Sequence, residues 1–199
     1  MGAPGTPSGA YESFLIPWAE DDKTMHDRQR QAADRSLLKT AIDQSIRQNP
    51  ADLQIRDTLP GTDLAINNGG ASPAYLEKWI IPSALVAGTE VNYVNLTLPN
   101  NKAVAFYAVG SPMASPSITR IRFLQNTAAV TGVFQTELMN LMQEPFAYLN
   151  TFQLFIPQQQ ATIAVMPWQA QNANTEQLTF AARTIEPVGT VITNPPGVS

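Results

Sequence analysis

The chain contains no cysteine, a single histidine and few charged residues. The lack of cysteine excludes disulfides, thiolate metal sites and cysteine nucleophiles. The lone histidine, His26, falls in a polar helical pattern, which favours a solvated side chain over a base or a metal ligand. A solvated His26 leaves no base for a Ser-His-Asp system, and a zinc site would have to use carboxylates alone. We therefore expect no enzyme, no metal and no cofactor.

The scarcity of charge also limits the partners. Charged residues make up 14% of the 199 residues and the formal net charge is -4, whereas soluble domains typically have roughly 25% charged residues. The lysines and arginines form no run of three, so the basic footprint of a nucleic-acid binder is missing. No apolar stretch approaches the roughly 18 residues of a membrane span, and the first residues do not resemble a signal peptide. We expect a protein made in a cytoplasm that binds neither nucleic acid nor membrane.

The first fifty residues divide into an arm and a helix. Residues 1–20 hold Gly, Pro and Ser around a short apolar patch, which is too small for a core and either folds back on its own domain or docks on a neighbour. Residues 21–49 change to apolar residues at helical spacing, and Asn49-Pro50 supplies the stop. One helix face is expected in water and the other on the rest of the protein or on another subunit.

The remaining chain predicts strands. Residues 50–88 are interpreted as an irregular linker segment with a short strand near 53–58. Residues 89–199 hold short β-branched and aromatic runs bounded by Asn, Pro and Gly. The predicted fold class is therefore mainly β: an antiparallel, jelly-roll-like β-sandwich preceded by an extended N-terminal arm and one α-helix. The expected strands are 90–98, 102–109, 117–125, 130–142, 151–156, 161–167, 177–185 and 189–193.

Three local patterns refine this prediction. Pro99-Asn100-Asn101 is interpreted as a hairpin turn between the first two strands. Arg120 and Arg122 alternate with apolar residues, which is typical of a strand with one wet face. Residues 133–142 would serve equally well as strand or helix.

Charge is distributed unevenly along the chain. Of the 28 charged side chains, 16 fall in residues 1–60, and the rest of the chain is rich in Asn and Gln. Because charged residues usually keep one sheet edge from pairing with another chain, a sandwich surfaced with amides has weakly protected edges. We expect copies of the chain or a neighbouring protein to cover those edges and faces; the alternative is a neutral soluble surface with edges hidden by loops.

Three stretches of the predicted sandwich carry a family resemblance: residues 102–109 (KAVAFYAV), 116–123 (PSITRIRF) and 178–192 (LTFAARTIEPVGTVI). Their style and strand order resemble jelly-roll-like virion proteins of tailed bacteriophages, particularly capsid decoration or cement proteins. The resemblance implies a homo-oligomer, such as a trimer, that is made in the host cytoplasm and sits on a capsid through the major capsid protein or other virion proteins. Apolar groups without an obvious core of their own are the expected interface residues: Phe14, Ile16 and Trp18 from the arm, and Leu38 and Ile42 from the helix.

Three alternatives stay open at this point. The chain would also suit a single-jelly-roll protein that forms the shell itself. A carbohydrate- or receptor-binding module of a tail fibre or spike would use aromatic residues for stacking. The candidates are Trp79, Trp168, Tyr93, Tyr107 and Tyr148, although aromatic residues with apolar neighbours at strand spacing are more often core or interface anchors. An enzyme would need paired carboxylates, as in a glycoside hydrolase, but Glu144 and Glu186 each precede a proline and are interpreted as turn residues.

Overall fold

The computed structural model describes residues 15–17, 23–46, 49–59, 63–64, 80–81, 84–111, 113, 116–126, 128–129, 134–135 and 146–190. In this part of the chain there is one α-helix, α1 (Lys23–Asp43), and a short 3-10 turn, η2 (Pro50–Asp52). All other regular elements are strands, which confirms a mainly β protein: β1 (Leu15–Pro17), β2 (Leu53–Asp57), β3 (Val91–Thr97), β4 (Ala103–Gly110), β5 (Ile118–Gln125), β6 (Ala128–Ala129), β7 (Phe134–Gln135), β8 (Phe146–Phe155), β9 (Gln160–Pro167) and β10 (Thr179–Pro187).

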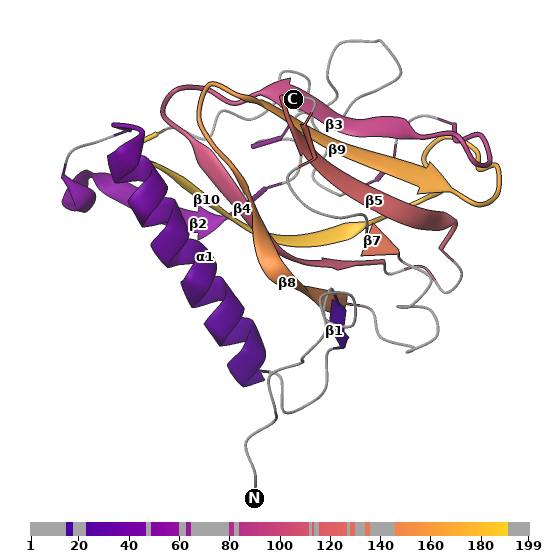
Figure 1. The fold of residues 1–199 in the computed structure, drawn as a ribbon, viewed down its shortest axis with the longest axis horizontal. Helices are drawn as coiled ribbons and strands as arrows, with labels where there is room; N and C mark the ends of the chain where they lie inside the picture. The colour runs from indigo at the N-terminus through magenta and orange to yellow at the C-terminus, as the bar shows by residue number, and fades with distance from the viewer. Residues whose placement is uncertain are drawn as a thin grey trace, which may run out of the picture.

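The strands form two antiparallel sheets (Figure 1). Sheet A has the order β1-β8-β4-β10-β2, and sheet C has the order β3-β9-β5-β6 with β7 also on β5. The long pairs are nested along the chain, because β4 pairs with β8, β3 with β9 and β2 with β10. A long hairpin folded over in this way gives the double Greek key of a jelly roll, so the predicted sandwich is confirmed.

The core between the sheets is built around four phenylalanines. Phe106, Phe155 and Phe180 come from sheet A and Phe123 from sheet C. Their ring centroids lie 5.4 to 6.2 Å apart in mostly tilted or edge-to-face pairs, the arrangement that aromatic quadrupoles favour. Aliphatic residues from both sheets surround these rings. The core therefore joins the sheets through side chains that alternate along each strand.

A second apolar layer lies on the outer face of sheet A, where α1 packs. Ala33, Leu37 and Ala41 of the helix are fully buried there. Beneath them β4 presents Ala103 and Ala105, whose small side chains allow the helix to approach the sheet closely. Because β4 has the core on one face and the helix on the other, all its residues are buried. Of the two expected positions for the helix, the structure shows the one on its own sandwich.

Several sequence predictions need correction. The chain does turn at Pro99-Asn100-Asn101, but the hairpin is wrong, because β3 and β4 belong to different sheets and the turn carries the chain across the sandwich. Within the segment 50–88, the short strand expected near 53–58 is confirmed as β2, which pairs with β10. β10 runs on to Pro187 and is followed by a turn with Gly189 at φ 80°, so the expected strand 189–193 does not begin there. Within 133–142 the described residues are those of β7, and the others lie outside the described part.

Candidate functional site

The five expected interface residues fall into three groups. Phe14 and Trp18 lie outside the described residues. Ile16 belongs to β1, whose backbone pairs with β8 opposite Tyr148. Leu38 is partly buried against the apolar layer beneath α1, whereas Ile42 is 50% exposed. Since Leu38 and Ile42 are four residues apart on one helix, they are neighbours on its surface, and Ile42 is the more exposed of the two.

Polar contacts attach α1 to sheet A. The Nε of Arg183 on β10 donates to Asp34 on the helix at 2.8 Å, and its guanidinium also donates to Asp57 of β2 at 2.5 Å. Burial would lower the pKa of Arg183, but these hydrogen bonds outweigh burial and raise it. Near the start of the helix, Nδ1 of His26 lies 3.2 Å from the hydroxyl of Tyr148 on β8. The helix is therefore fixed to the sheet by charge as well as by packing.

A buried group of four charged side chains closes one end of sheet A. Arg56 of β2 donates to both carboxylate oxygens of Asp63, at 2.6 and 2.7 Å, and to Glu186 of β10 at 2.8 Å. Lys102 donates to Asp63 at 2.8 Å and lies 3.5 Å from Glu186. The side chains of Asp63 and Glu186 have no exposed surface. Two cations therefore balance two fully buried carboxylates.

These four charged side chains hold distant parts of the chain together. Burial alone would raise the pKa of Asp63, but hydrogen bonds from Arg56 and Lys102 outweigh it and hold that pKa below its usual value. The prediction that Glu186 is a turn residue is wrong, because it lies within β10 and bonds Arg56 across the sheet. Its partners come from distant parts of the chain, so no local signal announces them. A substrate cannot reach either carboxylate in this arrangement.

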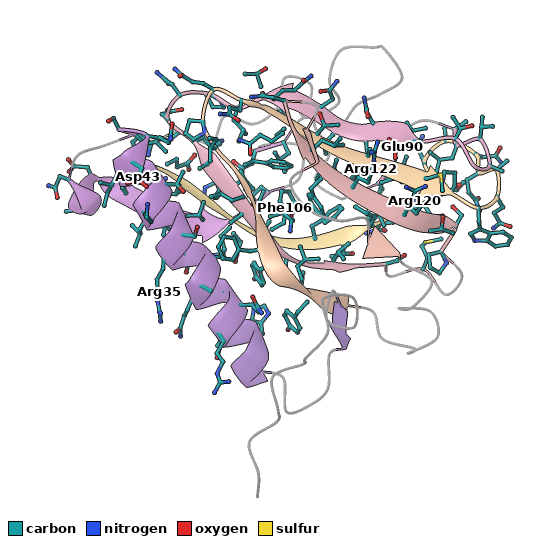
Figure 2. The ribbon with its side chains drawn as sticks, in the orientation of Figure 1. Arg35, Asp43, Glu90, Phe106, Arg120 and Arg122 are labelled. Atoms are coloured by element: carbon teal, nitrogen blue, oxygen red, sulfur yellow. The ribbon has the colours of Figure 1, made fainter. Side chains whose placement is uncertain are left out.

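The outer face of sheet C, unlike that of sheet A, carries no described helix (Figure 1). Figure 2 shows Glu90, Arg120 and Arg122 on this sheet, on the other side of the molecule from Arg35 and Asp43 of α1. Directly paired residues share one face of an antiparallel sheet. The register therefore places ten residues on the outer face of sheet C, called the open face below: Asn92, Asn95 and Thr97 of β3, Arg120, Arg122 and Leu124 of β5, and Gln160, Thr162, Ala164 and Met166 of β9. Thr162 and Ala164, on the central strand, are buried between their neighbours.

The polar groups of the open face are mutually ordered. Oδ1 of Asn95 accepts hydrogen bonds from Nε2 of Gln160 at 2.8 Å and from Oγ1 of Thr162 at 3.2 Å. Arg122 forms an ion pair with Glu90. The predicted wet face of this strand is confirmed, since Ile121 and Phe123 are buried while the arginines lie on the other side.

Trp168 stands at the end of the open face. It directly follows β9, continues the alternation of its outward residues and is 58% exposed. Its indole Nε1 donates to the carbonyl of Pro116 at 3.3 Å, and its backbone N–H donates to Ser117 at 2.9 Å. Trp79, the other tryptophan considered for stacking, lies outside the described residues, as does Glu144. The sequence pointed to Trp168 as an aromatic residue, but its exposure follows only from the structure.

Metal binding and membrane insertion find no support among the described residues. No group of three or more His, Asp or Glu side chains is placed among them to hold a metal ion. None of their helices is long and apolar enough to span a membrane.

Comparison with known proteins gives little. No family model and no curated protein matches the chain. Among solved structures, the catalytic unit of a thermostable GH87 α-1,3-glucanase from Streptomyces thermodiastaticus strain HF3-3 is 13% identical, with a TM-score of 0.28 over 73% of this chain and 28% of that one. The tandem CBM51 modules of a family 98 glycoside hydrolase from Streptococcus pneumoniae SP3-BS71 are 17% identical, with a TM-score of 0.26 over 76% of this chain and 46% of that one. The chain spans less than half the length of either protein, and similarities this weak carry no argument about function.

Proposed function

We propose that this chain is a non-enzymatic structural protein of a virion, most plainly a capsid decoration, cement or minor capsid protein that stabilises a phage shell through subunit interfaces. Jelly rolls also occur in lectins and cupins, so the fold alone does not select among these functions. The proposal rests on how the sandwich uses its charges.

Most charged side chains of the described sandwich are engaged within the protein. Lys102 and Glu186 belong to the buried group of four, Arg183 binds the helix, and Glu176 accepts hydrogen bonds from the backbone and hydroxyl of Ser117 at 2.7 to 3.2 Å. On the described part of the sandwich, few charged side chains are left on the outside to keep other chains away. This internal use of charge is the observation that carries the proposal, because a surface without repulsion suits permanent contact with neighbouring subunits.

The edge strand β3 supports the same proposal. It pairs with β9 on one side, and no described strand pairs with its other side. Its sequence from Val91 to Thr97 contains no charged residue and no proline, which are the usual devices that protect an edge. The bulge at Tyr93 protects part of it. The backbone from Val94 to Thr97 can therefore pair with a strand of a neighbouring subunit.

Quantitative mass spectrometry of purified virions that encode this chain tests the proposal. A virion structural protein is expected in a fixed copy number relative to the major shell protein, and particles that lack it are expected to break at lower temperature. Absence of the chain from purified particles would contradict the proposal.

One observation favours a second candidate. The exposed Trp168 suits a carbohydrate- or receptor-binding module of a tail fibre or spike, in which the sandwich binds a ligand instead of a shell.

A further inference from the structure

Trp168 is held in place although it is exposed. Hydrogen bonds fix both its backbone, through Ser117, and its indole edge, through Pro116. The neighbouring turn is fixed as well, because the N–H of Gly88 donates to Pro167 at 2.8 Å and Leu85 forms a β-bridge with Gln171. A ring held in this way loses little conformational freedom when a ligand stacks on it, so its faces are preorganised for binding.

The open face next to this ring offers hydrogen-bonding groups for which the described residues provide few partners. The Oδ1 of Asn95 is occupied by Gln160 and Thr162, which directs its NH₂ group to other acceptors. Arg120 lies 3.9 Å from the sulfur of Met166 and has no carboxylate partner among the described residues. Diagonal neighbours across an antiparallel pair are about 7–8 Å apart, so Arg120 and Trp168 lie close enough to contact one ligand.

The composition of this face identifies the ligand. The core of a protein interface holds several apolar anchors, whereas the sheet face described here combines one exposed indole with amides, hydroxyls and two arginines. Nucleic acid would need more cations without partners. A sugar ring has an apolar face for an indole and hydroxyls for amides, so it matches both kinds of group.

We propose that the outer face of sheet C, ending at Trp168, binds an oligosaccharide. The ring of Trp168 stacks on one sugar, Arg120 bonds its oxygens, and Asn92 and Asn95 contact further units. Trp168 follows Thr162 by six positions along the chain, a span of about 20 Å at strand geometry, which exceeds one sugar ring. This site rests on the second candidate function, the carbohydrate-binding module. It does not use α1, which packs on sheet A, or β1, which belongs to that sheet (Figure 1), but it shares β3 with the edge proposed to pair with a neighbouring strand.

The test applies the full chain to an array of neutral and carboxylate-bearing oligosaccharides of known structure, followed by calorimetry on the best probe. Binding is expected to weaken by about tenfold or more in Trp168→Ala, the effect of losing one aromatic contact with its buried area. Arg120→Gln should weaken binding as well, and most strongly for a carboxylate-bearing probe. Thermal unfolding of each variant shows that the sandwich is intact.

Val86→Ala is the matched control, because Val86 is also exposed and lies in the turn next to Trp168. It should leave the affinity unchanged. No binding to any probe on the array, or binding unaffected by Trp168→Ala, would overturn the site. If Trp168→Ala instead reduced the mass of the protein in solution without any glycan binding, the indole would be a protein contact and the proposal would be wrong.

Discussion

Arg183 of β10 donates through Nε to the carboxylate of Asp34, 2.8 Å away on α1. This contact joins the last strand of the jelly roll to a helix that precedes all but one of its described strands. The helix is thereby part of the folded unit, with an apolar layer beneath it and an ionic contact beside it. Changes at Asp34 or on the buried face of the helix therefore act on sheet A.

Asp34→Ala tests this contact. The substitution leaves the buried Arg183 with Asp57 as its remaining carboxylate, and the expected loss of unfolding free energy is about 1.5–3 kcal/mol, the range for hydrogen bonds to charged groups. Urea denaturation measures it. The control Asp43→Ala removes an exposed pair with Lys39 on the same helix and should cost at most about 0.5 kcal/mol. Equal effects in both variants would show that the Arg183 contact adds nothing.

Asp63→Asn tests the buried group of four charges. Removing one charge leaves Arg56 and Lys102 incompletely paired, at an expected cost of about 3–5 kcal/mol near neutral pH. The pKa of Asp63 is depressed in the folded state, so its stabilisation is present above the unfolded pKa of about 3.9 and is lost as pH falls through the lower folded value. Denaturation at a series of pH values should show this acid loss in the native protein and less of it in Asp63→Asn.

The exposed Asp52 offers a control for the same experiment. Asp52→Asn should keep the acid dependence of the native protein and nearly all its stability. An acid dependence that is identical in Asp63→Asn and the native protein would contradict the role given to Asp63.

His26 gives a direct titration, because it is the only histidine and produces a single imidazole signal in NMR spectra. The pKa of His26 lies below 6.5, because burial has the largest effect on it. Nearby Asp27 and Asp57 raise this pKa in part, and Arg30 lowers it further. Since the unfolded chain binds the proton first, stability from this group is present above about pH 6.5 and declines as pH falls to the folded pKa. A folded midpoint at or above that of the urea-unfolded chain would contradict this account.

The two sides of α1 can be separated by substitution. Leu37 is fully buried on sheet A, so Leu37→Ala should cost about 2–5 kcal/mol of unfolding free energy. Ile42 is half exposed, and Ile42→Ser should change stability by no more than about 0.5 kcal/mol. If Ile42 contacts a partner, its substitution should weaken association while the fold stays intact. A large loss of stability in Ile42→Ser would place this residue in the core instead.

The sequence predicted local features better than long-range ones. Helical spacing from Ala33 to Ile46 located α1, and alternation around Arg120 identified the wet face of β5, because both patterns repeat within a few residues. The sequence predicts the turn after Leu98, but whether this turn joins neighbouring strands or crosses the sandwich depends on β9 and β10, far along the chain. Arg56, Lys102 and Glu186 meet for the same reason, through strand pairing that no local pattern encodes.

The mass of the full chain in solution, measured by light scattering over a range of concentrations, tests the assembly role most directly. A truncation of residues 1–48 would be a poor test, because it would uncover the apolar layer of sheet A. The full chain is therefore compared with the triple variant Phe14→Ser, Ile16→Ser and Trp18→Ser. We predict a mass that is a multiple of 21.6 kDa and falls toward a single chain in the variant while the sandwich stays folded. A mass of one chain at every concentration, unchanged by the variant, would contradict assembly through the arm.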